Sequence, residues 1–176
     1  MTENCYVCEG KGSFLHLNRL ICKKCFLRTI EKRVKKHLGR RLFKKDDQVL
    51  VVGEVERELL ESAVKEMPLQ IVAKKKLPKK VKGVDFIVIG KTLDELDGEF
   101  LKDLFQGRIG ISKKAEEKIK MFNILEPLTD EEVKIYAGIK KIKVEIKDRK
   151  EPLKLFEEYK ELKYNLYNTI KELRGF

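Results

Sequence analysis

The hydrophobic pattern of the chain changes its period several times, and each change predicts a new element. Gln48–Gly53 (QVLVVG) and Val84–Gly90 (VDFIVIG) are short, nearly continuous apolar runs that end in glycine, as buried strands of a parallel sheet do. Leu69–Ala73 is a further strand candidate, and Met121–Leu125 is another apolar stretch. In Ile142–Ile146 apolar residues alternate with charged ones, which predicts a short, half-exposed strand.

Helical patterns separate these strands. Glu54–Glu66 and Leu93–Phe105 follow the first two runs, and a third helix is expected after Pro127. There Thr129 and Glu132 have the spacing of a capping box, with Thr129 as N-cap. Apolar residues at helical spacing predict a long C-terminal helix: Leu155, Tyr159, Leu162, Leu166, Ile170 and Leu173. Strands that alternate with helices indicate an α/β domain with a mostly parallel sheet.

All four cysteines lie in the first 25 residues, in two C-x-x-C pairs: Cys5, Cys8, Cys22 and Cys25. Two thiolates three positions apart can bind one metal ion from a tight turn, and two such pairs complete a tetrahedron. Zinc is the first choice, and an iron–sulfur cluster, which also accepts four thiolates, is the alternative. Four protein ligands leave no open position, so the metal is expected to be structural. His16 lies between the pairs and is expected to be a packing or surface histidine.

A basic helix is predicted directly after the second pair, over Phe26–Phe43. Leu27, Ile30, Val34 and Leu38 recur at spacings of 3, 4 and 4 and form its apolar face. Residues 19–45 hold twelve Lys or Arg and one acidic residue, so this segment alone carries +11, which equals the formal net charge of the whole chain. The opposite face is predicted to bind RNA phosphates, and a solvated helix face is the alternative. Its basic residues are Arg28, Lys32, Arg33, Lys35, Lys36, Arg40 and Arg41.

Length and composition allow one ordinary domain with a small module attached. We expect a zinc-binding knuckle and basic linker helix over residues 1–45 and an α/β domain over residues 46–176 of the 176. Charged residues make up 39% of the chain and tryptophan is absent, a composition that is also typical of hyperthermophile proteins. The N-terminus has no apolar segment of a secretory signal, and no stretch approaches the length of a membrane span. We therefore expect a cytoplasmic protein with no membrane partner.

Four segments together resemble a known family. They are CFLRTIEKRVKKHLGRRLFKKDDQVLVV, VIGKTLDELDGEFLKDLFQGRI, ILEPLTDEEVKIYAGIKKI and YKELKYNLYNTIKELR. With the double C-x-x-C before them, they are similar to the tRNA thiolation enzymes that carry a PP-loop ATP-pyrophosphatase domain and make 2-thiouridine in tRNA. The resemblance implies a reduced PP-loop domain with a Rossmann-like fold of the adenine nucleotide hydrolase type.

The chain departs from the active members of this family at their reactive motifs. Active members carry Ser-Gly-Gly-x-Asp-Ser after the first strand, where small residues let backbone N–H groups hold the pyrophosphate of ATP. In a later motif, Lys91 stands where active members have a histidine, and Glu95 stands where they have the second of two aspartates. In addition, no cysteine follows Cys25. At the first motif the chain reads Gly53-Glu54-Val55-Glu56-Arg57-Glu58. We therefore expect no catalytic residue, no nucleotide-binding residue and no bound ATP.

With these departures, the chain most resembles the non-catalytic partner subunit of the eukaryotic-type cytoplasmic tRNA 2-thiolation complex, in an archaeal version. The resemblance implies a pseudo-enzyme that forms a heterodimer with a catalytic PP-loop paralogue, in which the paralogue activates uridine 34 of tRNA. Two alternatives remain at this stage. One is a free-standing zinc-ribbon RNA-binding protein, and the other is a PP-loop enzyme with altered ATP chemistry.

Overall fold

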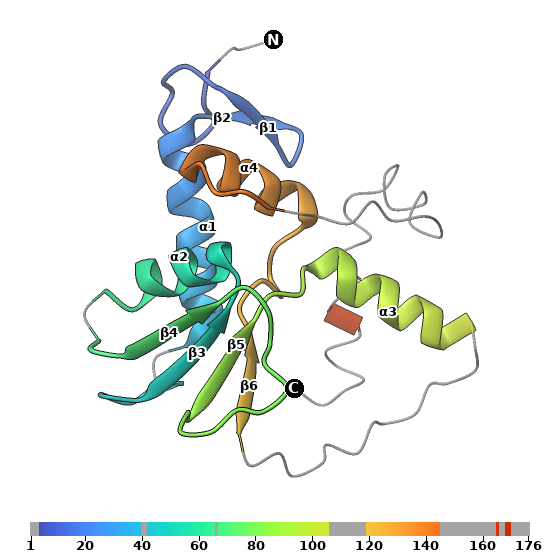
Figure 1. Cartoon of the computed structure of the whole chain (residues 1–176). Helices are drawn as coiled ribbons and strands as arrows, with labels where there is room; N and C mark the ends of the chain where they lie inside the picture. The colour runs from blue at the N-terminus through green and yellow to red at the C-terminus, as the bar shows by residue number, and fades with distance from the viewer. Residues whose placement is uncertain are drawn as a thin grey trace.

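The computed structural model describes residues 4–39, 42–65, 67–105 and 119–144, and also residues 165, 168 and 169. A small antiparallel hairpin comes first and is followed by a helix and then by the strands and helices of a four-stranded sheet (Figure 1). In chain order the elements are β1 (Phe14–His16), β2 (Arg19–Ile21), α1 (Lys23–Leu38), β3 (Gln48–Val52), α2 (Glu54–Ala63), β4 (Gln70–Lys74), β5 (Phe86–Ile89), α3 (Leu93–Phe105), β6 (Lys120–Asn123) and α4 (Asp130–Lys140).

The four strands of the larger sheet are all parallel and lie in the order β4-β3-β5-β6. The chain runs outward from β3 to β4 and then crosses back past β3 to β5. The order therefore reverses between β3 and β5, so that the loops leaving these two strands diverge. In open α/β sheets this reversal creates a crevice at the carboxyl ends of the strands, where ligands usually bind.

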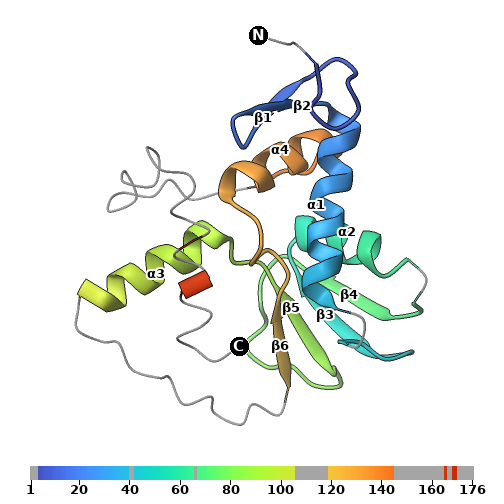
Figure 2. The ribbon, with the colours of Figure 1, turned by 180° about the vertical axis from the view of Figure 1, so that it is seen from behind.

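Helices α1 and α2 cover one face of the sheet, and α1 also contacts α4 and the hairpin (Figures 1 and 2). Alternate residues of a strand point to one face, and Val49 and Val51 of β3 pack here with Val88 of β5. Ile30 and Val34 of α1 are completely buried against them. The apolar core is continuous from the hairpin through α1 to the sheet, which fixes the orientation of the cysteine cluster relative to the α/β part.

Helix α1 begins earlier and ends earlier than the apolar spacing predicts. Its N-cap is Cys22, whose sulfur accepts a hydrogen bond from the backbone N–H of Cys25 at 3.5 Å. It ends at Gly39, where φ is 68°, a left-handed value that glycine adopts without steric cost. The predicted helix over residues 26–43 therefore becomes a helix over Lys23–Leu38, and Phe26 joins its buried face while Leu27 is only partly buried.

Helix α4 begins as the sequence predicts, but the way it ends was not predicted. The capping box is present: the Glu132 N–H donates to Thr129 Oγ1, and the Thr129 N–H donates to Glu132 Oε2 at 3.0 Å. At the other end Lys141 is left-handed and the Ile142 N–H donates to the Ala137 carbonyl, as in a Schellman motif. The strand predicted from residue 142 to 146 is therefore wrong over its described part, residues 142–144.

The predicted C-terminal helix falls mostly outside the described residues. This holds for all six residues of its apolar pattern, which are Leu155, Tyr159, Leu162, Leu166, Ile170 and Leu173. Among the helices of the described ranges, none has the length and apolar character needed to cross a bilayer.

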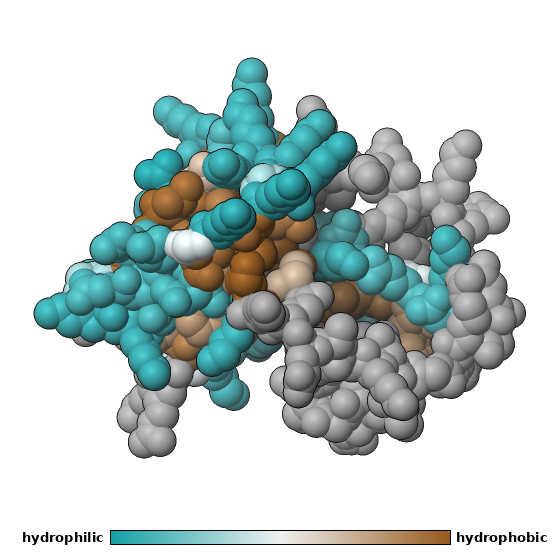
Figure 3. Space-filling model, turned by 60° about the horizontal axis from the view of Figure 1, so that its bottom comes forward, coloured by the Kyte–Doolittle hydropathy of each residue, from teal (hydrophilic) through white to brown (hydrophobic). Residues whose placement is uncertain are grey.

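The other face of the sheet carries an apolar row across all four strands. Leu50 of β3 pairs with Val72 of β4 and Ile87 of β5, and Ile87 pairs with Met121 of β6. Leu50 and Ile87 are buried, whereas Val72 and Met121 on the outer strands are 49% and 45% exposed. Seen from below, the molecule exposes hydrophobic surface between hydrophilic side chains (Figure 3).

Candidate metal centre and strand-end crevice

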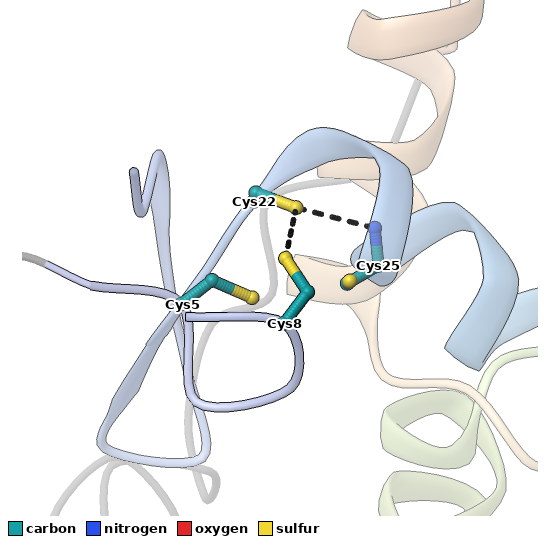
Figure 4. Close-up of side chains that lie close together, drawn as sticks. All are labelled: Cys5, Cys8, Cys22 and Cys25. Atoms are coloured by element: carbon teal, nitrogen blue, oxygen red, sulfur yellow. Dashed lines mark hydrogen bonds between the residues drawn. The ribbon is translucent and has the colours of Figure 1, made fainter. Parts of the chain in front are cut away.

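The four cysteines converge on one point beside the start of α1 (Figure 4). Cys5 and Cys8 come from the turn before the hairpin, and Cys22 and Cys25 come from the N-cap and first turn of α1. All four sulfur atoms lie within 4.8 Å of one another, and the sulfurs of Cys8 and Cys22 are 3.7 Å apart. Tetrahedral bonds of about 2.3 Å to a single ion would place sulfurs roughly 3.8 Å apart. The cluster can therefore bind a metal ion.

Backbone N–H groups donate hydrogen bonds to two of these sulfurs. The Val7 N–H donates to the sulfur of Cys5 at 3.4 Å, and the Cys25 N–H donates to that of Cys22. The turn between Cys5 and Gly10 is closed by the Cys5 N–H, which donates to the Gly10 carbonyl at 2.6 Å.

The two buried thiols of the cluster, Cys5 and Cys25, have pKa values shifted in opposite directions. Burial raises the pKa of Cys5, but backbone N–H groups, with that of Cys22 the strongest, bring it down to about 6. The pKa of Cys25 is raised to about 12, first by its interaction with the thiol of Cys8 and then by burial. A divalent cation at the centre would stabilise every thiolate that binds it.

His16 is a packing residue and does not belong to the cysteine cluster. It is 5% exposed, and its Nε2 lies 2.8 Å from Oε1 of Glu132 in α4. Its Nδ1 is 3.3 Å from the hydroxyl of Tyr6, and its ring meets Phe26 edge-on. Of the two expectations for His16, a packing histidine and a surface histidine, the structure shows the packing histidine.

The basic residues predicted to bind RNA divide into three groups. Arg28, Lys32, Lys35 and Lys36 are exposed on α1. Arg33 instead donates to both carboxylate oxygens of Glu132, at 2.8 and 2.9 Å, so that its guanidinium already has a counter-charge inside the protein. The remaining two, Arg40 and Arg41, lie outside the described residues.

The crevice between β3 and β5 holds a carboxylate. Gly53 follows β3 and Gly90 follows β5, and a Cβ added at either glycine would collide with the side-chain carboxylate of Glu56. Gly53 also has a φ of 117°, so the position requires glycine for its backbone as well. The side chain of Glu56, in the first turn of α2, therefore turns back between the carboxyl ends of the two strands.

The surroundings of Glu56 disfavour a further negative charge. Burial raises the pKa of Glu56, its own backbone N–H lowers it, and the negative charge of Glu95 raises it again. The other two glutamates of the segment lie elsewhere, since Glu54 is exposed and Glu58 pairs with Lys140 of α4 at 2.7 Å. Of the three glutamates in the segment from Gly53 to Glu58, Glu56 is the one that reaches the crevice.

The charged residues that follow β5, from Lys91 to Glu95, hold the fold together. Lys91 pairs with Glu99 at 2.7 Å on the surface, and Glu95 accepts the Thr92 N–H at 3.0 Å. Asp94 accepts the backbone N–H of Asp130 at 2.7 Å and so caps the start of α4. These side chains stabilise helix ends, which is the role that acidic residues commonly have there.

Sequence reasoning missed the contacts that cross between elements. Glu132 was predicted only as a capping residue, yet it also binds His16 and Arg33. Lys140 lies between Glu58 and Glu31, and no spacing in the sequence indicated that contact. The one available signal was the presence of polar residues on otherwise apolar helix faces.

The chain is similar to solved structures but not to curated sequences. No protein-family model matches the chain, and no curated protein sequence matches it. Among solved structures the chain is similar to one described as the U34-tRNA thiolase NcsA from Methanococcus maripaludis with its 4Fe-4S cluster. The TM-score is 0.76 and the identity is 17%, over 99% of this chain and 89% of that chain. This likeness shows a shared fold and confirms the expected α/β architecture.

Proposed function

We propose that this chain is a non-catalytic partner subunit of a tRNA thiolation enzyme. It binds a catalytic PP-loop paralogue and tRNA in the cytoplasm, and so assists 2-thiolation of uridine at wobble position 34. The shared fold with a protein described as a U34-tRNA thiolase supports the connection to tRNA thiolation. The sequence resemblance points to the same family through segments spread over most of the chain.

The position of Glu56 is the observation that carries the non-catalytic part of the proposal. A phosphate in the crevice between β3 and β5 would need the space and the backbone N–H that the Glu56 carboxylate already uses. Two unit negative charges about 4 Å apart repel by roughly 4 kcal/mol at an effective dielectric constant near 20. Such a penalty lowers affinity by about three orders of magnitude, so the crevice disfavours ATP.

Sulfur transfer likewise lacks a thiol in the α/β part of the chain. The four cysteines all lie before residue 26. They meet in one cluster, and a metal ion bound by all four would leave no free thiolate for chemistry. The chain therefore needs a partner that supplies both ATP activation and sulfur.

For the metal itself we propose one structural zinc ion on Cys5, Cys8, Cys22 and Cys25. The close spacing of the four sulfurs suits a single tetrahedral ion. In an iron–sulfur cluster each thiolate binds a different iron at the corner of a larger unit, which needs more widely spaced sulfurs. The 4Fe-4S cluster named for NcsA is therefore the alternative to be tested for this chain.

The two parts of the chain take different tasks in this proposal. Residues 1–45 hold the zinc and present the exposed basic residues of α1 to tRNA, and residues 46–176 form the scaffold that binds the paralogue. Arg28, Lys32, Lys35 and Lys36 support the first task, because they are exposed on one helix, and the acidic residue of that helix, Glu31, pairs with Lys140 of α4. Arg33 is left out because it is paired with Glu132.

Affinity purification of the tagged chain from its native cell tests the proposal. We expect a second PP-loop protein with an intact Ser-Gly-Gly motif and tRNA to co-purify, and we expect deletion of the chain to remove 2-thiouridine from tRNA. Recovery of RNA without a PP-loop protein would favour the free-standing RNA-binding alternative. A matched control is the deletion strain complemented with Lys91→Ala, which should thiolate tRNA normally because, among the described residues, the Lys91 ammonium pairs with surface Glu99 alone.

A further inference from the structure

A groove lies between the C-terminal ends of α1 and α2, and it combines an apolar floor with a rim of lysines. Figure 2 shows where these two helices lie in the fold. The volume of the groove is about 860 Å³, which lies within the range of roughly 300–1,000 Å³ that is typical of ligand sites. The floor contains the half-buried side chains of Leu42, Ala63, Val64 and Met67. The rim is formed by Lys32, Lys35, Lys36, Lys45 and Lys65.

The rim carries positive charge that the described part of the protein does not neutralise. Lys32, Lys35 and Lys36 lie three and four positions apart and so share one face of α1. Lys45 and Lys65 come from the segments that follow α1 and α2. All five lysines are exposed, and within the described ranges none of them pairs with a carboxylate and no acidic residue lines the groove.

Helix dipoles explain only a small part of this charge. Lysines in the last turn of a helix interact favourably with its partially negative C-terminus, and Lys35 and Lys36 occupy such positions. Two helix ends offer together about one unit of negative charge, whereas the rim carries five positive charges. The remaining positive charge is available to an anionic ligand.

We propose that this groove binds an unpaired stretch of RNA, with the lysine rim on the phosphates and a base against the apolar floor. The inference rests on the RNA-binding part of the proposed function and names the site and the form of RNA. Unpaired bases can turn outward into a pocket, whereas the bases of a duplex are stacked inside it. An acidic partner helix fits less well, because such a helix needs an apolar stripe about two turns long, whereas the apolar side chains of this groove lie between lysines from α1 and from the segments after both helices.

Charge reversal on the part of the rim outside α1 tests the phosphate contacts. We would measure binding of a fluorescent single-stranded RNA oligonucleotide of mixed sequence to the isolated full chain over a series of salt concentrations. Lys45→Glu/Lys65→Glu should weaken binding by at least about tenfold and reduce the slope of log K against log salt by about 1.4, or 0.7 for each lost phosphate contact. The matched control is Lys79→Glu/Lys80→Glu, which makes the same charge change in the exposed loop between β4 and β5 and should alter affinity less than about twofold.

Removal of the base tests the apolar floor. Replacing the nucleotides by abasic units should weaken binding to the unmodified chain by about fivefold or more, as expected for lost base contacts. In Met67→Ser the difference in affinity between intact and abasic RNA should shrink, while the salt slope stays unchanged. If Met67→Ser changes the melting temperature or loses the metal, Val64→Ala replaces it as the test variant. Equal binding of duplex and single strand, equal loss in the control, or displacement of the RNA by stoichiometric inorganic pyrophosphate would each overturn the inference. If the groove variants behave as expected and no PP-loop paralogue co-purifies from cells, the inference stands and the partner-subunit proposal fails.

Discussion

Replacing Glu132 with glutamine should destabilise the protein by about 3 kcal/mol. The Glu132 side chain is 5% exposed and binds Arg33 of α1 and His16 of the hairpin, both at 2.8 Å. Glutamine keeps the volume of the side chain and can still complete the capping box with Thr129, so the substitution mainly removes the charge. Loss of one partner of a buried ion pair costs about 3–5 kcal/mol, and we take the lower end because the Arg33 side chain is 25% exposed and retains some water.

Urea unfolding followed by circular dichroism at neutral pH measures this effect, with the free energy taken from the midpoints at a common m-value. The matched control is Glu54→Gln, which removes an exposed glutamate from the first turn of α2 and should cost less than about 1 kcal/mol. A loss of only that size for Glu132→Gln would refute the reasoning, because it would show that the ion pair contributes nothing net over a neutral hydrogen bond.

The pH dependence gives a second test of the same contact. Burial raises the pKa of Glu132, but the hydrogen bond from His16 and the charge of Arg33 outweigh burial and hold it below its ordinary value of 4.5. The stabilisation is therefore complete above that unfolded-state value and is lost as the pH falls through the lower folded-state pKa. The difference between Glu132→Gln and the unmodified chain should be constant near neutral pH and shrink below pH 4.5. The cysteines are present in both proteins, so their titration does not affect the difference in stability. If this difference stays unchanged in acid, the low pKa is not that of Glu132.

Three further predictions address the metal, the crevice and the core. Elemental analysis should give about one zinc per chain, Cys22→Ser should abolish it, and iron with labile sulfide in anaerobically purified protein would show a cluster instead. Calorimetry of the isolated chain with Mg²⁺–ATP should detect no binding because Glu56 fills the crevice, and micromolar affinity would falsify the pseudo-enzyme proposal. Within the described residues the Tyr136 hydroxyl is buried without a hydrogen-bond partner, so Tyr136→Phe should be neutral or stabilising in thermal melts. A loss above about 1 kcal/mol would mean that the hydroxyl has a partner.

Local signals in the sequence predicted the elements well. The runs at Gln48–Gly53 and Val84–Gly90 became β3 and β5, and the Thr129 and Glu132 spacing became a capping box. Each of these features depends on neighbours within a few residues, which a period or a motif records. The errors were also local: the predicted strand from Ile142 begins in a helix C-cap, because the alternation of apolar and charged residues there cannot reveal a left-handed Lys141.

Contacts between distant segments could not be read in the same way. The cysteine cluster was predictable because two C-x-x-C pairs have few other uses at this spacing. The link from His16 to Glu132 spans 116 residues, and the return of the Glu56 side chain to Gly90 depends on how two strands become neighbours. Both follow from strand order and helix packing, which hydrophobic periodicity does not determine.

The contact between His16 and Glu132 also sets an order of events during protein synthesis. The hairpin and its cysteines leave the ribosome 116 residues before the side chain that holds the hairpin to α4. At roughly 5–20 residues per second this interval lasts about 6 to 23 s. Throughout this interval the hairpin lacks the contact that joins it to α4. Metal binding by the nascent cysteines would shield their thiols before α4 arrives.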